Sequence, residues 1–187
     1  MSTKTNKKND GKIFEEEFKK SVPADCYCYR LKDNPLAYMQ VQGVSYTHDN
    51  PCDFFVYDGK HGKFYALELK STTNLAFTVQ ATKEESKKMI KYNQIEGLNK
   101  IAAYPNIVAG FMFCFIDKQE NPKDTTQEFY FLDIASFNNM MESIDKHSCN
   151  KQDIIDYGAI CVNARKLQVN YRLDLEELFY YCAFGNI

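Results

Sequence analysis

Residues 51–71, PCDFFVYDGKHGKFYALELKS, decide the fold that we expect, because they have the pattern of two strands joined by a tight turn. The first strand, residues 53–57, is short and aromatic, and the second, residues 64–69, alternates apolar and other side chains. Between them, Asp58-Gly59 and Gly62 provide turn chemistry, since glycine adopts a positive φ without steric cost. The stretch therefore predicts a β-hairpin.

Three charged side chains are expected to meet on this hairpin. Side chains along a strand point alternately to opposite faces, so Glu68 and Lys70 project from the same face, and Asp53 begins the neighbouring strand. Burying two carboxylates without partners is costly. A divalent metal ion held by oxygen atoms of Asp53 and Glu68 would remove that cost, and Mg²⁺ commonly takes one or two protein carboxylates. Lys70 would then position or deprotonate a water, or stabilise charge on a phosphate.

A simpler interpretation of the same residues is an exposed Glu68–Lys70 pair on an edge strand, with Asp53 in a turn. Glu-x-Lys triplets are common, so the triplet alone favours this simpler interpretation. The aspartate one hairpin strand upstream, and the apolar residues around all three side chains, favour the metal site.

Composition limits the class of protein. The 187 residues are enough for one domain with a sizeable core, and 44% apolar and 26% charged residues are typical of a globular protein. A net charge of −2 means that any role in nucleic-acid binding depends on local basic patches. The longest apolar run, residues 107–116, is too short to span a bilayer. With no secretory signal and seven scattered cysteines, we expect reduced thiols and a cytoplasmic location.

The remaining elements follow from hydrophobic periodicity and from turn and cap residues. Residues 1–10 are expected to be a flexible basic arm, and residues 11–187 a single domain. The fold class that we predict is α/β, with a mixed central sheet and helices on both faces. We expect helices at 11–22, 82–104, 133–146 and 175–183, strands at 26–31, 108–116, 128–132 and 159–162, a loop or short helix at 150–157, and an extended piece at 165–171.

The expected helix at 82–104 begins with a capping-box pattern and carries polar residues of interest. Gln94 falls within its apolar stripe, where an amide must find hydrogen-bond partners. Lys83, Lys87 and Lys91 lie on or beside the same face, and they are candidate contacts for DNA phosphates. A solvated helix start with a hydrogen-bonded core glutamine explains the pattern equally well.

Four short motifs together resemble the PD-(D/E)xK nuclease superfamily, and most resemble the Holliday junction resolvases of the RecU type. These motifs are Gly11-x-x-Phe14-Glu15, Pro51-x-Asp53, Glu68-x-Lys70 and Gln94-Ile95-Glu96. Four further stretches carry the resemblance to the RecU type: residues 70–72, 92–96, 128–132 and 171–174.

The resemblance implies a restriction-endonuclease-like fold and Mg²⁺-dependent hydrolysis of DNA phosphodiester bonds, with Mn²⁺ able to substitute. It also implies a homodimer that cuts four-way junctions in recombination and repair. By motif, Asp53, Glu68 and the carbonyl of Leu69 would hold the metal, and Lys70 would be the catalytic lysine. Glu15, or its neighbour Glu17, would join the metal shell or position water. Gln94 would support the site.

Two alternatives stay open. The chain is also consistent with another PD-(D/E)xK endonuclease of the restriction or repair type, because residues 22–51 are shorter and less basic than the RecU-type insertion that enters a junction. A phage or mobile-element resolvase would fit as well. The second alternative is a non-catalytic DNA- or protein-binding module that keeps the fold.

Overall fold

The computed structural model describes residues 9–31 and 50–185, and the structural statements that follow concern these residues. In chain order, the elements are α1 (Asp10–Ser21), β1 (Cys26–Arg30), β2 (Phe54–Asp58), β3 (Lys63–Thr72), β4 (Ala76–Thr78), α2 (Tyr92–Ala102), β5 (Ile107–Asp117), β6 (Thr126–Asp133), α3 (Ile134–Ser143), β7 (Ser148–Asn150), α4 (Lys151–Asp156), β8 (Ile160–Val162), β9 (Ala164–Leu167), β10 (Asn170–Leu173) and α5 (Leu175–Phe184).

Six strands form a mixed sheet in the order β1-β2-β3-β5-β6-β8. β3 and β5 run parallel, and the other neighbouring pairs are antiparallel. Parallel neighbours require a crossover connection, and here β4 and α2 lie in the connection between β3 and β5. The predicted hairpin at residues 51–71 is thus the β2–β3 pair inside this sheet.

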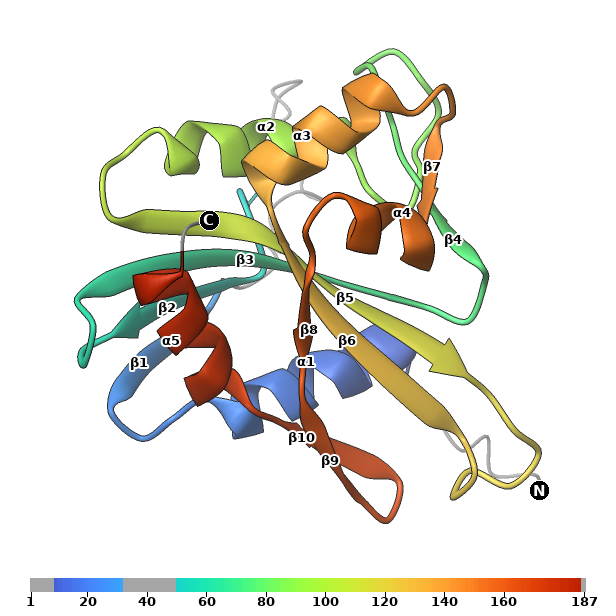
Figure 1. Cartoon of the computed structure of the whole chain (residues 1–187). Coiled ribbons are helices and arrows are strands. Elements are labelled where there is room, and N and C mark those ends of the chain that lie inside the picture. The colour runs from blue at the N-terminus through green and yellow to red at the C-terminus, as the bar shows by residue number, and fades with distance from the viewer. Residues whose placement is uncertain (1–8, 32–49, 186–187) are drawn as a thin grey trace, which may run out of the picture.

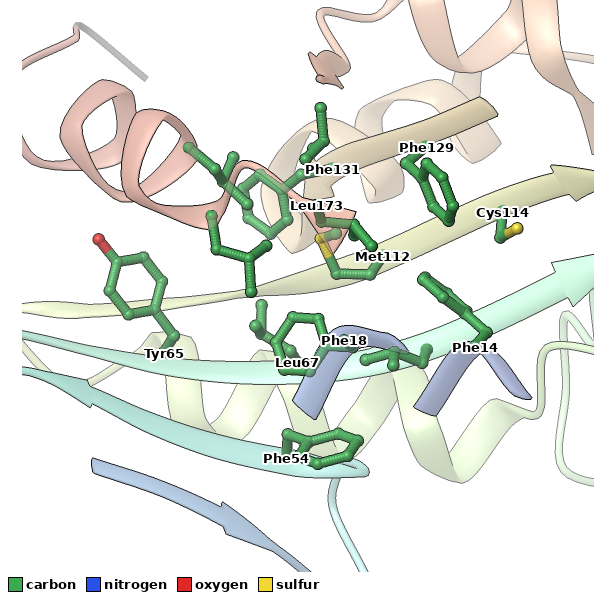
Figure 2. Packing of buried hydrophobic residues seen from close by; sticks show 14 of the residues in the cluster. Phe14, Phe18, Phe54, Tyr65, Leu67, Met112, Cys114, Phe129, Phe131 and Leu173 are labelled. Atoms are coloured by element: carbon green, nitrogen blue, oxygen red, sulfur yellow. The ribbon is translucent and has the colours of Figure 1, made fainter. Parts of the chain in front are cut away.

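Helices cover both faces of the sheet, which confirms the predicted fold class. α2 and α3 lie on one face and α1 and α5 on the other (Figure 1). Figure 2 shows the core on the second face, where Phe14 and Phe18 of α1 pack towards Leu67 of β3. The ring of Tyr65 stacks on Phe179 of α5, with ring centroids 4.4 Å apart. β3 therefore alternates between two cores, as its sequence predicts, and Ala66 packs into the other core.

The prediction of one helix over residues 82–104 is wrong, because α2 begins only at Tyr92. Ile90 is extended and forms a bridge with Val79. The Ile90 N–H donates to the Thr78 carbonyl at 3.0 Å, and the Gln80 N–H donates to the Ile90 carbonyl at 2.9 Å. These bonds occupy backbone groups that a helix would need. The capping-box pattern at residues 82–85 therefore lies in turns that precede the helix.

The other predicted elements are observed with shifts of a few residues at their ends. Residues 150–157 contain the short helix α4, residues 159–162 contain the sheet-edge strand β8, and residues 165–171 contribute to the β9–β10 hairpin. The arm at residues 1–8 and the connection at residues 32–49 lie outside the described residues. All seven cysteines are free. Among the described helices, none has the length and apolar character needed to cross a bilayer.

Glu17 is a buried acid that ties α1 to β10. It is 3% exposed, and its Oε1 accepts the backbone N–H of Tyr171 at 2.8 Å. Its Oε2 has no hydrogen-bond partner among the residues that the structure describes. Burial raises the pKa of Glu17 to about 7, although the Tyr171 N–H and the charge of Lys20 oppose the rise. The contact to Tyr171 gives this glutamate a role in packing.

Glu17→Gln is expected to remove part of the pH dependence of stability. The folded-state pKa lies above the ordinary value of 4.5, so the folded protein binds more protons between these values, and the free energy of unfolding falls as pH rises through this window. The share of Glu17 is on the order of 1–2 kcal/mol after allowance for solvent screening. Denaturant titrations below and above the window measure it. The exposed Glu142→Gln is the matched control, and an equal pH dependence in both variants would contradict the prediction.

Candidate active site

Asp53 is placed against β3 by two backbone contacts. Its own N–H donates to the Leu67 carbonyl at 3.1 Å. Its carboxylate Oδ2 accepts the backbone N–H of Leu69 at 2.8 Å. Because Glu68 lies between these two contact points on β3, the structure brings Asp53 and Glu68 to the same place. Glu68 belongs to β3, and Asp53 is the residue that immediately precedes β2.

Glu68 is a buried carboxylate with two side-chain partners. It is 3% exposed, and its Oε1 accepts from Lys70 Nζ at 2.9 Å and from the side-chain amide of Gln94. Burial raises the pKa of Glu68 to about 7, the Asp53 charge adds to the rise, and the Lys70 and Lys91 charges oppose it. Of the residues that the sequence singled out, Asp53, Glu68, Lys70 and Gln94 thus meet in one cluster.

Gln94 connects this cluster to the start of α2. It occupies the third helical position, where its Oε1 accepts the backbone N–H of Lys91 at 3.0 Å while its amide nitrogen donates to Glu68. The amide is therefore satisfied from both sides, as a half-buried glutamine requires. Gln94 thus links the first turn of α2 to β3.

Gly97 allows α2 to pack closely on the chain that leads into Asp53. A Cβ atom at this position would lie 2.8 Å from Pro51 Cα and 2.9 Å from the Pro51 carbonyl oxygen. Contacts this short with backbone cannot be relieved by a side-chain rotation. A glycine is therefore needed for the approach of α2 to Pro51.

Burial also raises the pKa of Asp53. The charge of Glu15 adds to the rise, and the Leu69 N–H and the charges of Lys70 and Arg30 oppose it. Glu15 itself is paired with Arg30, whose Nε lies 2.5 Å from Glu15 Oε2. Glu15 is therefore near enough to act on the Asp53 charge, but Arg30 holds its carboxylate.

Arg30 was not singled out from the sequence. It ends β1, and the next residue, Leu31, donates its N–H to the Asp53 carbonyl at 2.9 Å. One feature of the sequence could have pointed to Arg30. It is a charged residue near the end of a predicted strand, and the long connection that follows leads to Asp53.

The predicted phosphate-contacting lysines line a groove beside the cluster. Lys83, Lys87 and Lys91 lie along a groove of about 750 Å³ between the segment that precedes α2 and α2 itself. They come from turns and extended chain, so the prediction that they share a helical face is wrong. Lys100, in the last turn of α2, lines the same groove and was not predicted. The charge of Lys91 also opposes the rise in the pKa of Glu68, so this end of the groove lies near the carboxylate cluster.

Comparisons with known proteins found a relative in sequence and solved structures that resemble the fold. No family model matches the chain. A solved structure of Hjc, a Holliday junction resolvase from Archaeoglobus fulgidus, superposes with a TM-score of 0.45 at 15% identity, and covers 77% of this chain and 90% of its own. A likeness this weak carries no argument about function.

The relative in sequence is the SPbeta prophage-derived uncharacterized protein YotM of Bacillus subtilis (strain 168). It is 32% identical over an alignment of 182 residues that covers 91% of this chain and 85% of YotM. Identity at this level over nearly the whole of both chains is sufficient to show common ancestry. The chain belongs to the family of YotM.

Proposed function

We propose that the protein is a metal-dependent endodeoxyribonuclease that cuts branched DNA, with Asp53, Glu68 and Lys70 at its active site. The observation that carries the proposal is the cluster itself: two carboxylates and a lysine are held together by β3 and the residue that precedes β2, near a groove that four lysines line. A packed scaffold gains nothing from two adjacent carboxylates with raised pKa values.

The donor set suits Mg²⁺ or Mn²⁺. Both proposed ligands are hard carboxylate oxygens, and each carboxylate has a raised pKa that a nearby cation would lower. Among the described residues, no three His, Cys, Asp or Glu side chains converge as a metal site. Asp53 and Glu68 would therefore hold the ion together with water, substrate phosphate and the Leu69 carbonyl. Such an ion would supply Lewis-acid activation of water and would neutralise charge on the phosphate.

The protein's own side chains would then orient the reaction. Lys70, 2.9 Å from Glu68, is placed to hold the attacking water or to stabilise charge that develops on the phosphate. Gln94 fixes the Glu68 carboxylate, since its amide donates to the same oxygen as Lys70. Arg30 holds Glu15 close enough for Glu15 to influence Asp53.

The lysine groove supports DNA as the substrate. Lys83, Lys87, Lys91 and Lys100 bring four cations to one groove that also holds Glu85 and Glu96, although the whole chain carries a net charge of −2. Phosphate contacts of this kind position DNA without reading its sequence. We further propose that a homodimer presents two such sites and cuts two strands of a four-way junction.

The test is incubation of the purified protein with a labelled four-way junction and a linear duplex of the same sequence, with and without Mg²⁺. We expect paired cuts in the junction only when Mg²⁺ is present. Equal cutting of the linear duplex would favour a restriction- or repair-type endonuclease of the same chemistry. Binding without cleavage in Mg²⁺ and in Mn²⁺ would favour a non-catalytic DNA-binding module and would contradict the proposal.

A further inference from the structure

A second cluster of cations lies on the β9–β10 hairpin, apart from the carboxylate cluster. Arg165 and Arg172 are register partners on neighbouring antiparallel strands, so their side chains leave the same face of the hairpin. Both are exposed. Like charges placed directly opposite each other destabilise a strand pair. This pair therefore has an energetic cost that packing does not explain.

The two arginines line a cavity of about 570 Å³ between the end of α1, the hairpin and the start of α5. The acids in that cavity have other partners: Asp174 caps α5 by accepting the Glu177 N–H at 3.0 Å, and Glu176 pairs with Lys60 at 3.0 Å. Within residues 9–31 and 50–185, neither arginine forms a hydrogen bond or ion pair. Two guanidinium groups in the cavity thus remain available for an anion.

The remaining polar groups at this end of α1 are engaged in holding the hairpin. Ser21 Oγ donates to the Glu17 carbonyl at 2.7 Å and accepts the Leu173 N–H at 2.9 Å. On the opposite face of the hairpin, Lys166 Nζ donates to the Thr125 carbonyl at 2.6 Å. The hairpin is therefore fixed on both sides, and the arginines are presented from a rigid support.

We propose that Arg165 and Arg172 form a second phosphate-binding site, which takes a backbone phosphate of the DNA substrate. The ligand class follows from the chemistry, since guanidinium groups bind phosphate oxygens through paired N–H donors. The inference rests on the proposed function in one respect, namely that DNA supplies the phosphate. The site extends the DNA contact from the lysine groove to the opposite face of the sheet, along α1.

The test is DNA binding at several salt concentrations, in the absence of divalent metal, for the wild type and Arg165→Gln/Arg172→Gln. We expect the double variant to bind the junction roughly tenfold more weakly, and the slope of log K against log salt to fall by about two. The control is Lys118→Gln/Lys151→Gln, which removes the same charge from two lysines that are already paired with Asp10 and Glu128. Thermal melting should show that the arginine variant is at least as stable as the wild type, because the like-charge pair has been removed.

The outcomes separate this inference from the proposed function. An arginine-dependent salt slope in a protein that cuts no DNA would support the phosphate site and reject the nuclease. Normal cleavage, with the same affinity and slope in the arginine and control variants, would support the nuclease and overturn the phosphate site. If inorganic phosphate binds the wild type and not the arginine variant, while DNA affinity is unchanged, free phosphate is the ligand and the assignment to DNA is overturned.

Discussion

Asp53→Asn is expected to reduce the rate of DNA cleavage by about a thousandfold or more while DNA affinity stays within about twofold of the wild type. The asparagine side chain can still accept the Leu69 N–H that holds residue 53 against β3, so the local structure should persist. It cannot supply the anionic oxygen that a divalent cation requires. Single-turnover cleavage with Mg²⁺, together with binding by fluorescence anisotropy without metal, measures the two quantities.

Asp145→Asn is the matched control, because Asp145 is exposed in the segment after α3. Lys70→Ala should also reduce DNA cleavage and leave DNA affinity unchanged, since it removes the amine 2.9 Å from Glu68. If either Asp53→Asn or Lys70→Ala cut a four-way junction at the wild-type rate in Mg²⁺, the assignment of the active site would be wrong.

The second large effect concerns stability with and without divalent cation. Glu68 has a folded-state pKa of about 7 against an ordinary 4.5, so without metal the free energy of unfolding should fall as pH rises through this window. A cation held by Asp53 and Glu68 requires the ionised carboxylates, so binding should strengthen as pH rises. At a free concentration one hundred times the Kd, stabilisation is about 2.7 kcal/mol. Thermal melts with and without Mn²⁺ or Mg²⁺, across that pH range, measure both trends.

Glu68→Gln separates the effect of Glu68 protonation on stability from the effect of metal binding. Without metal, the free energy of unfolding of the variant should depend less on pH than that of the wild type. Above a pH of about 7, the variant should not be stabilised by metal. The exposed Glu142→Gln should behave like the wild type. A wild-type melting temperature that neither cation changes at high pH would contradict the assignment of Asp53 and Glu68 as ligands, whatever the cleavage assay shows.

The candidate site was predictable where it depends on local periodicity. The strand alternation of residues 64–69 places Glu68 and Lys70 on one face, and the turn between β2 and β3, where Gly62 has a φ of 65°, returns the chain to the neighbouring strand. Gln94 was also predictable, because an amide in an apolar stripe needs partners, and one of its partners is Glu68. The start of α2 was not predictable in this way. The bridge between Ile90 and Val79 depends on chain segments that meet only after folding.

The sequence by itself determined the α/β class, the hairpin, and the close placement of Asp53, Glu68 and Lys70, because a period of two along a strand and a tight turn are local properties of the chain. Tertiary structure alone decided the pairing of Glu15 with Arg30, the burial of Glu17 against Tyr171, and the meeting of Arg165 and Arg172 in a cavity beside α1. The first two contacts depend on how α1 packs on the sheet and on β10, and the two arginines line a cavity only because their hairpin lies against the end of α1.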